Sequence, residues 1–281
     1  MKTAIQNKYD FAALITVAKA NPNGDPLADN RPREDFDGYG EISDVCIKRK
    51  LRNRLQDLGE KVFVQSNDRC DDGMKSLAER VSSNTNMKQF DGKDENAYAE
   101  AACDEWYDVR AFGQVFAFQK GISVGVHGPV SIQTAVSVDP INIASVQITK
   151  SVNGAAKDGG RSSDTIGRKD RVEFGLYVVR GAINPQLAEK TGFSDEDAEK
   201  LLEALKTLFE NDASAARPEG SMEVQQVYWW KHNCKNGQYS SAKVQRTLSI
   251  EKNVDDPKSF EDYTITLNNL EGLEPEIYQG W

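Results

Sequence analysis

The strongest chemical signal in this 281-residue sequence is a group of cationic side chains near its start. Five cations occupy seven positions: Lys48, Arg49, Lys50, Arg52 and Arg54. The whole chain has a net charge of −9, so this concentration of positive charge is local. Clustered Lys and Arg side chains neutralise phosphate groups, which makes nucleic acid a ligand to consider. The alternative is a solvated helix face, the usual role of a run of charges.

A second basic segment lies between residues 150 and 180, where seven cations stand against four anions. Several glycines within residues 153–171 predict a long, mobile loop there. Four of its side chains have the chemistry to hold a phosphodiester backbone: Arg161, Ser162, Arg168 and Lys169. The segment lacks the G-x-x-x-x-G-K-[ST] order, which argues against a nucleotide-binding P-loop. An ordinary surface loop is the alternative.

Residues suited to catalysis or metal binding are scarce. The two histidines, His127 and His232, lie far apart in the sequence, and the four cysteines form no C-x-x-C pair. This pattern argues against a zinc site and a disulfide framework, and it favours a reducing cytoplasm. Three acidic loop residues are only a weak metal signal: Asp25, Asp35 and Asp37. We therefore expect no catalytic residues, no metal and no cofactor.

Two polar motifs surround these basic segments. Asn21-Pro22-Asn23-Gly24-Asp25-Pro26 is dense in turn-forming residues, and it would place Asn21 and Asn23 near a ligand or form a plain turn. The last 31 residues carry eight anions and two cations, which indicates an acidic C-terminal segment. A positive groove on a negative body would explain this separation of charge, although acidic surfaces also serve solubility.

The elements that position these residues can be read from apolar spacing. Ser43 is a suitable N-cap and Gly59 a suitable C-terminal residue for a helix over 43–58. Its apolar face consists of Ile47, Leu51, Leu55 and Leu58. The first flank of that face carries Lys48, Arg49 and Arg52, and the other carries Lys50 and Arg54. The sequence thus predicts two basic flanks on one amphipathic helix.

Around this helix, β-branched and aromatic runs predict strands at 9–17, 61–65, 172–180 and 222–231, and a second helix at 194–211. The order βαβ-βαβ is that of ferredoxin-like or RRM-like α+β domains. Residues 66–171 are too long for a connection, so we expect an inserted subdomain with helices near 71–81 and 94–108. Further strands are expected within 122–138, 141–150 and 263–267. The aromatic run at 174–177 and the pair Trp229 and Trp230 are interpreted as core residues rather than base-stacking platforms.

Several motifs together resemble the backbone subunit of the CRISPR Cascade surveillance complex, in the form found in subtype I-C. They occur in the order of that family and lie at residues 21–26, 43–53, 108–116, 128–133, 161–169, 175–177 and 191–194. The similarity spans about residues 8 to 230 and is less clear beyond Lys231.

The resemblance implies an RRM-like palm at 1–65 and 172–235, a helical finger-like insertion at 66–140 and a thumb-like basic loop at 141–171. The acidic segment at 236–281 has no role implied by it. By analogy with the family, RNA contacts are assigned to ten residues: Asn21, Asn23, Ser43, Lys48, Arg49, Arg52, Arg161, Ser162, Arg168 and Lys169.

The resemblance also implies several copies stacked along a guide RNA (crRNA), with guide bases pairing with a target DNA strand and with other Cascade subunits as partners. It implies no catalysis, and the sequence shows no run of 18 apolar residues and no signal-peptide core, so we expect a cytoplasmic protein without a membrane partner. Two alternatives remain open. One is an RRM-like CRISPR endoribonuclease, for which Asp25 is the carboxylate to test. The other is a stand-alone module that binds single-stranded RNA.

Overall fold

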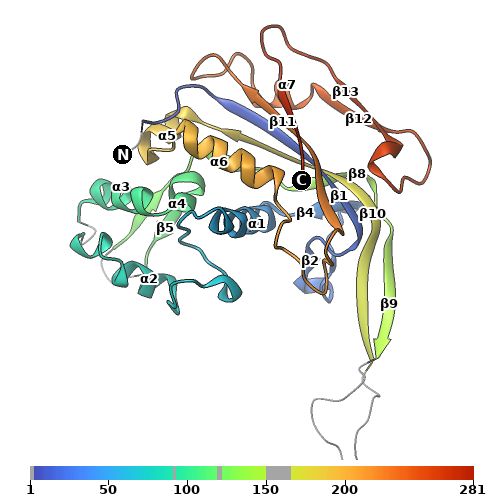
Figure 1. Ribbon diagram of the computed structural model, residues 1–281, viewed down its shortest axis with the longest axis horizontal. Helices are drawn as coiled ribbons and strands as arrows, with labels where there is room; N and C mark the ends of the chain where they lie inside the picture. Colours follow the sequence, from blue (N-terminus) through green and yellow to red (C-terminus); the bar gives the residue numbers. More distant parts are fainter. Residues whose placement is uncertain (1–2, 91–92, 119–121, 150–165) are drawn as a thin grey trace, which may run out of the picture.

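The computed structural model describes residues 3–90, 93–118, 122–149 and 166–281, and it mixes helices and strands as predicted (Figure 1). One large antiparallel sheet has the spatial strand order β14-β11-β1-β10-β8-β4, and β7 and β9 also pair with β10. These strands are β1 (Tyr9–Ala20), β4 (Tyr39–Ile42), β7 (Val130–Ile132), β8 (Ala135–Pro140), β9 (Ile143–Thr149), β10 (Ile166–Ile183), β11 (Met222–Lys231) and β14 (Glu276–Gln279).

The sheet is buried on both faces at β1, which lies between β10 and β11. Phe11 and Ile15 point to one face and Ala12 and Leu14 to the other, because side chains alternate along a strand. All four are buried, and the two pairs belong to separate hydrophobic clusters. The sheet therefore has a core on each side.

Helices cover the first face: α1 (Asp44–Asp57), α5 (Pro185–Thr191) and α6 (Asp195–Lys206) (Figure 1). Leu51 and Leu55 of α1 pack in one buried cluster with Leu201 and Leu205 of α6. The N-cap predicted at Ser43 is confirmed, because its hydroxyl accepts a hydrogen bond from the amide of Cys46. The helix predicted at 194–211 is present but ends earlier, at Lys206.

The chain beyond β11 covers the second face. It contains α7 (Ser241–Gln245), β12 (Leu248–Lys252), the short helix η4 (Phe260–Asp262), β13 (Tyr263–Leu267) and finally β14, which adds an edge strand to the sheet (Figure 1). Val244 and Tyr263 pack there against Leu176 and Trp230. The predicted strand at 263–267 is confirmed, and so is the interpretation of the aromatic residues of β10 and β11 as core.

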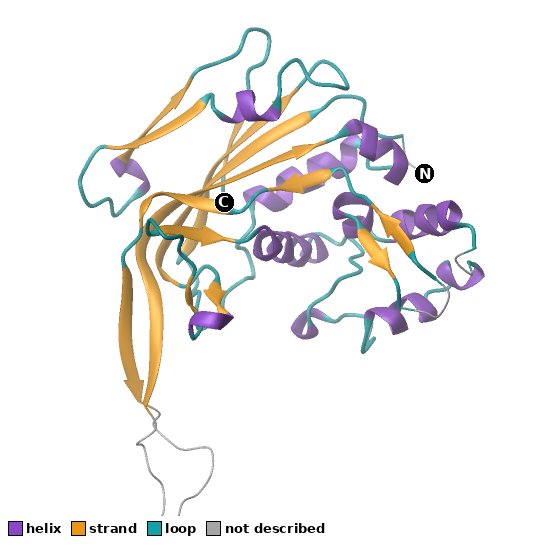
Figure 2. Ribbon diagram, turned by 180° about the vertical axis from the view of Figure 1, so that it is seen from behind, coloured by secondary structure: helices purple, strands orange, loops and turns teal. Residues whose placement is uncertain are grey.

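The insertion predicted after α1 contains the predicted helices and has its own core. Its elements are η2 (Asn67–Arg69), α2 (Leu77–Ser83), η3 (Met87–Gln89), α3 (Glu95–Glu105), α4 (Tyr107–Phe112), β5 (Gln114–Phe116) and β6 (Val124–Val126). Phe63, Trp106 and Phe116 stack at its centre, with ring centroids 4.7 to 6.4 Å apart. In Figures 1 and 2 it forms a lobe beside α1, on the opposite side from β9.

The prediction of a strand at 61–65 is wrong. The amides of Phe63 and Val64 donate to the carboxylate of Asp108, at 2.6 and 3.1 Å, so these residues bond a side chain instead of a neighbouring strand. In the sheet, β8 pairs with β10 where the predicted strand was expected. Alternating apolar residues alone could not distinguish these two outcomes.

The basic loop predicted at 153–171 is partly strand. Residues 166–171 belong to β10 and pair with β9 from Thr149 to Ala144, whereas residues 153–165 lie outside the described part of the chain. Together β9 and the first part of β10 form a two-stranded arm that extends beyond the sheet (Figures 1 and 2). We call residues 143–149 and 166–171 the arm.

A buried hydrogen bond between His232 and Asp10 ties β1 to the start of the C-terminal segment. Nε2 of His232 lies 2.8 Å from Oδ2 of Asp10, and both side chains are inaccessible to solvent. Nδ1 of His232 accepts a hydrogen bond from the amide of Gln238, so the proton lies on Nε2 and is donated to Asp10. Burial by itself would raise the pKa of Asp10, but the His232 hydrogen bond and the charge of Lys8 outweigh it, and the pKa is lowered.

This pair predicts a pH-dependent contribution to stability. A lowered pKa in the folded state means that ionised Asp10 stabilises the protein above the unfolded pKa of about 3.9, and that this contribution is lost as pH falls below it. Asp10→Asn should reduce the free energy of unfolding at pH 7 by roughly 2 kcal/mol. The difference from wild type should stay constant in urea titrations from pH 7 to about 4 and should shrink as the pH is lowered further, toward about 2. A difference that remains constant below about pH 4 would contradict this assignment, and exposed Asp255→Asn serves as the control.

Candidate nucleic-acid interface

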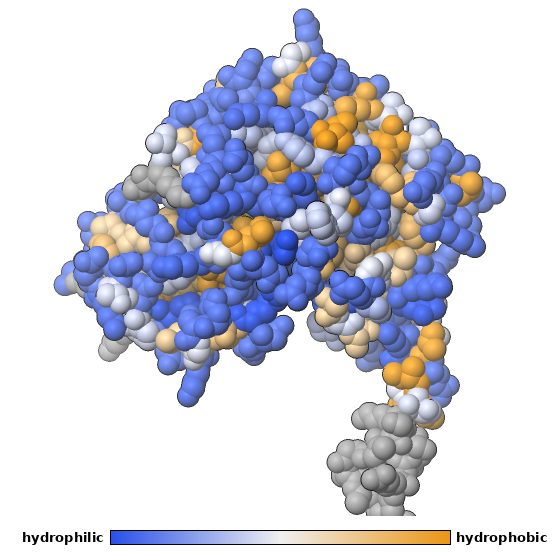
Figure 3. Space-filling view, viewed as in Figure 1, coloured by the Kyte–Doolittle hydropathy of each residue, from blue (hydrophilic) through white to orange (hydrophobic). Residues whose placement is uncertain are grey.

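The surface is notched between the inserted lobe and the part that carries the first loop of the chain (Figure 3). This loop contains β2 (Gly24–Asp25), the short helix η1 (Pro26–Ala28) and β3 (Arg31–Pro32). In Figures 1 and 2 it lies between α1 and the arm. We use the name hollow for this notch together with the adjoining surface of the first loop, the start of α1 and the facing side of the arm. The predicted site residues are compared with it below.

The asparagines of the 21–26 turn and Ser43 are bonded within the protein. Oδ1 of Asn23 accepts hydrogen bonds from the amide and the hydroxyl of Ser43, both at 2.9 Å. Nδ2 of Asn21 donates to the carbonyl of Asn30 at 2.7 Å, and Asn21 is buried. The turn is thereby fixed to the first turn of α1. These three side chains position the loop that lines the hollow.

The first basic flank of α1 contacts the insertion. Nε of Arg52 donates to Asp108 at 2.8 Å, and a guanidinium nitrogen of Arg49 donates to the carbonyl of Val64 at 2.7 Å. Lys48 forms an ion pair with Asp44, one turn earlier. Burial and the neighbouring charge of Arg52 both lower the pKa of Arg49, although the charges of Asp108 and Asp68 oppose them. Arg49 is only half-buried, which keeps it as a candidate contact for a phosphate.

The second flank contacts the segment that follows α6. Lys50 is only 3% exposed and forms an ion pair with Asp212, and burial lowers its pKa despite that partner. Nε of Arg54 donates to the hydroxyl of Thr207 at 2.7 Å. Lys50 and Arg54 therefore hold α1 against the segment after α6. The alternative of a solvated basic face therefore does not describe the second flank of this helix.

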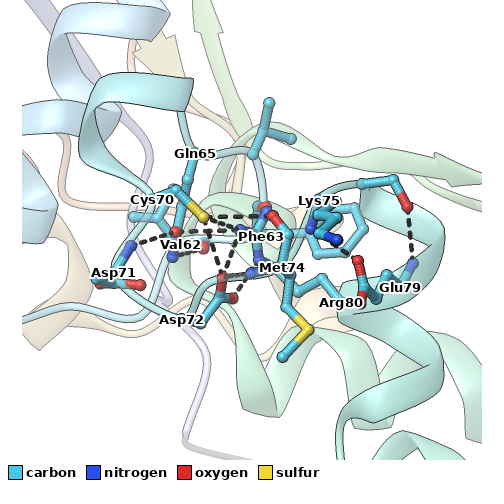
Figure 4. Close-up of polar contacts among 12 residues, drawn as sticks. Val62, Phe63, Gln65, Cys70, Asp71, Asp72, Met74, Lys75, Glu79 and Arg80 are labelled. Atoms are coloured by element: carbon cyan, nitrogen blue, oxygen red, sulfur yellow. Dashed lines mark hydrogen bonds and ion pairs between the residues drawn. The ribbon is translucent and has the colours of Figure 1, made fainter.

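Sequence reasoning missed Arg80, which organises the segment that leads into the insertion (Figure 4). Its guanidinium donates to the carbonyl of Phe63 at 2.7 Å and to both carboxylate oxygens of Asp72. The side chain is buried in a cleft of about 310 Å³. The cleft wall carries Lys61 but also Asp71, Asp72 and Glu105, so its charges are mixed. The arrangement suits a structural role better than phosphate binding.

The exposed cations at the hollow come from the arm and the first loop. Arg168 is 51% exposed and donates to Asp170 at 2.8 Å. Arg31 lies close enough to Asp170 to lower its pKa, together with the hydrogen bonds from Ser145 and Arg168 that outweigh the effect of burial. Arg31 and Arg33, each about one-third exposed, were not singled out from the sequence. The signal that could have identified them is in the sequence, where two arginines flank Pro32 directly after a turn.

Arg168 and Lys169 point to opposite faces of the arm because they are neighbours in a strand. Arg168 shares a face with Asp170, next to Arg31, and therefore lies toward the hollow. Lys169 is exposed on the other face, opposite Val146 in the register. One ligand bound in the hollow would thus contact Arg168 and not Lys169. Arg161 and Ser162 lie outside the described residues.

Groups that could perform catalysis are dispersed. The carboxylate of Asp25 accepts a hydrogen bond from the amide of Leu27 at 3.0 Å and lies 3.5 Å from Arg33. Among the described residues no three His, Cys, Asp or Glu side chains are grouped to hold a metal ion. In the same part of the chain, no helix is long and apolar enough to cross a membrane. The geometry of the hollow suits binding of a polyanion.

Comparison with known proteins agrees with the motifs in the sequence. The family model described as "CRISPR-associated protein Cas7" matches residues 7–268. The chain belongs to the Cas7 family. A Cas7 protein of Haloferax volcanii is 28% identical over 215 residues, which cover 69% of this chain and 62% of the relative. The chain thus spans less than two-thirds of that Cas7 protein.

Two solved structures are also similar to this Cas7-family chain. One is a chain of a "CRISPR RNA-guided surveillance complex, pre-nicking", with a TM-score of 0.49 and 16% identity, covering 79% of this chain and 78% of the other. The second belongs to a "CRISPR RNA-guided surveillance complex", with a TM-score of 0.47, 18% identity and coverage of 79% and 68%. The expected membership in a CRISPR family is confirmed by the family match.

The contacts of Asp108 generate a prediction about stability. Asp108→Ala should lower the free energy of unfolding by roughly 3 kcal/mol or more, because it leaves the Arg52 charge and two backbone amides without their acceptor. Chemical denaturation measures the effect. Asp255→Ala, which removes an exposed carboxylate from the β12–β13 hairpin, is the control and should change little. Equal midpoints for the two variants would show that Asp108 does not join α1 to the insertion.

Proposed function

We propose that this Cas7-family protein is a non-catalytic backbone subunit of a CRISPR Cascade complex and binds the guide RNA along the hollow. The observation that carries the proposal is a set of partly exposed cations around the hollow: Arg31, Arg33, Lys48 and Arg168. Each forms an ion pair with one carboxylate, that of Glu34, Asp25, Asp44 and Asp170 respectively, so a bound phosphate would compete with these carboxylates for the four cations. Membership in a CRISPR-associated family supports RNA as the polyanion.

The strand order supports an RRM-like palm. Strands β11-β1-β10-β8 are adjacent, and α1 follows β1 while α6 follows β10. Numbered along the chain, these four strands have the order 4-1-3-2, which a split βαβ arrangement produces. The division into palm, finger-like insertion, thumb-like arm and C-terminal segment stays a prediction. Strand β8, at the end of the predicted insertion, pairs within the palm sheet.

One face of the sheet is covered by the C-terminal segment, so RNA would bind elsewhere. RRM domains stack bases on an open sheet face. In this protein Leu176 and Trp230 on that face are buried beneath the C-terminal segment. Contacts at the hollow would be made by Arg and Lys side chains to phosphates, which fixes the backbone and leaves the bases free to pair with a target DNA strand. We therefore propose backbone recognition without base readout.

The proposal includes further copies of this chain and other Cascade subunits as partners, a cytoplasmic location and subtype I-C. It assigns guide phosphates to five described residues, and keeps Arg161 and Ser162 as predicted contacts. The five are Arg31, Arg33, Lys48, Arg49 and Arg168. Arg52, Asn21, Asn23 and Ser43 act on RNA through the positions that they give to α1 and the loop. The endoribonuclease and the stand-alone RNA-binding module remain the rival functions, and the experiments below separate them.

RNA affinity should depend on the cations of the hollow. The triple variant Lys48→Ala, Arg33→Ala and Arg168→Ala should bind every single-stranded RNA more weakly, regardless of sequence, because phosphate contacts carry no base information. Each lost contact should reduce the slope of log affinity against log salt by about 0.7, or about 2 in all. Fluorescence anisotropy at several salt concentrations measures both quantities.

The matched control replaces three exposed lysines elsewhere: Lys190→Ala, Lys243→Ala and Lys258→Ala. It removes the same charge and should leave the slope nearly unchanged. Lys50 and Arg54 are unsuitable as controls because their loss would weaken the packing of α1. A folded hollow variant with the affinity and slope of wild type would exclude the hollow as the RNA site. Binding of only one copy to a long RNA at saturation would favour the stand-alone module.

Nuclease activity should be absent. Purified protein incubated with labelled guide precursor or with complementary RNA, in Mg²⁺ or Mn²⁺, should leave both intact, because among the described residues no three His, Cys, Asp or Glu side chains are grouped to hold a metal ion. Gel electrophoresis of the labelled RNA measures this. Cleavage that disappears in Asp25→Asn would establish the enzymatic alternative, and the Asn side chain can still cap the amide of Leu27.

A further inference from the structure

Trp281 lies on the surface of the protein, unlike the other three tryptophans. It is 82% exposed, whereas Trp106, Trp229 and Trp230 are each at most 5% exposed. Tryptophan is highly buried on average in folded proteins. At protein interfaces it is enriched among the few residues that contribute most of the binding free energy. One exposed ring needs no explanation by itself, but this one is held in place and lines a cavity.

The backbone at Trp281 is fixed from two sides. Its amide donates to the carbonyl of Lys206, at the end of α6, at 3.2 Å, and the amide of Gly280 donates to the carbonyl of Gln225 in β11 at 3.1 Å. A Cβ on Gly280 would lie 1.6 Å from the carbonyl oxygen of Val224, so only glycine allows the chain to approach β11 this closely. In Figure 1 this end of the chain accordingly lies beside the end of α6. A residue on a fixed backbone loses less entropy when a partner binds it.

Trp281 lines a cavity of about 240 Å³ between the end of α6 and the start of β11. The apolar part of the lining comes from Leu208 and Phe209, which follow α6, and from Met222 and Val224 of β11. Pockets that hold a whole small molecule usually measure about 300–1,000 Å³. The size and the apolar lining therefore suit one long side chain of a partner. We call this space the Trp281 cavity.

Three carboxylates also line the Trp281 cavity: those of Glu210, Glu219 and Glu223. In the part of the chain that the structure describes, none of the three forms an ion pair. Lys206 lines the cavity too, but its ammonium pairs with Glu203 at 2.8 Å. Uncompensated negative charges repel a phosphate and attract a cation. Nucleic acid is therefore a poor ligand for this cavity.

An arginine side chain matches this combination of features. Its guanidinium is planar and weakly hydrated, so it stacks on an indole ring and donates hydrogen bonds to carboxylates at the same time. Its methylene groups would pack on the apolar lining. A lysine ammonium is more strongly hydrated, and a divalent cation would bind the carboxylates without any gain from the apolar lining.

We propose that the Trp281 cavity binds an arginine side chain of a basic partner protein. The net charge of −9 attracts such a protein, whereas it opposes the approach of a second copy of this chain to the cavity. The inference goes beyond the proposed function, because it concerns a protein partner and a surface that repels RNA.

Binding can be followed at the cavity itself. The capped tripeptide Gly-Arg-Gly should cause a saturable shift of the Trp281 indole N–H resonance in NMR spectra. Its Kd should be roughly fivefold or more below that of capped Gly-Lys-Gly. Capped Gly-Gln-Gly, which has no charge, should cause no shift. Equal affinities for the arginine and lysine peptides, or the same shift with Mg²⁺ alone, would overturn the assignment to arginine.

Two variants remove the ring and the carboxylates separately. Affinity for the arginine peptide, followed at the backbone amide of Gly220, should fall roughly fivefold or more for Trp281→Leu, because the cation loses the face of the ring. Glu219→Gln combined with Glu223→Gln should weaken binding to a similar degree, because two acceptors lose their charge. Wild-type affinity in either variant would contradict the proposal.

Matched controls separate the cavity from general attraction by charge. Phe36→Leu, at another fully exposed aromatic residue, should leave the affinity unchanged. Glu251→Gln combined with Glu261→Gln removes the same charge from exposed positions of the C-terminal segment and should also have no effect. All the substituted side chains are exposed, so the fold is expected to persist. Equal losses in the cavity variants and their controls would overturn the proposal.

Two further measurements complete the test. Dilution of the protein alone should leave the Trp281 resonance unchanged, and a shift would show that a second copy fills the cavity and would overturn the proposal. Peptide binding requires no RNA, so failure of this contact and failure of the proposed function are measured separately. A protein that binds RNA but shows no arginine-dependent shift would retain the proposed function and refute the contact.

Discussion

One buried carboxylate, that of Asp108, joins three parts of the protein. It accepts hydrogen bonds from the amides of Phe63 and Val64 and from Arg52 of α1. A buried carboxylate is unfavourable unless it is neutralised and hydrogen-bonded, so these three donors must remain close to it. The insertion is therefore held against α1, and α1 is held against the sheet by its apolar face. The positions of Lys48 and Arg49 on α1, relative to the insertion, depend on that placement.

The local features of α1 were predictable, and its surroundings were not. Ser43 and Gly59, with the spacing of Ile47, Leu51 and Leu55, located the helix because caps and amphipathic faces are encoded within a few residues. The partners of its cations are distant in sequence. Lys50 pairs with Asp212, and Arg52 pairs with Asp108. No periodicity within the helix contains that information.

The difference between local patterns and distant partners also explains why a strand was wrongly predicted at 61–65. The run at 61–65 has the composition of a strand, but the carboxylate of Asp108 satisfies its amides first. The Asp-Val-Arg-Ala-Phe-Gly motif that begins at Asp108 was noticed as part of a resemblance, without its physical role. The C-terminal segment was likewise noticed only as acidic. Its apolar residues Val244 and Tyr263 bury the second face of the sheet, so that face is not open to a ligand.

Charge density along a sequence is therefore a poor measure of charge on the surface. The five cations of α1 attract attention, yet Lys50, Arg52 and Arg54 are bound to other parts of the protein. Arg168 and Lys169 show that two cations adjacent in sequence need not lie on the same surface. They are adjacent in sequence, but the alternation of a β-strand turns one toward the hollow and the other toward the opposite side. A two-stranded arm with both faces exposed hence presents two different sets of side chains at one position along its length, Arg168 on one face and Lys169 on the other.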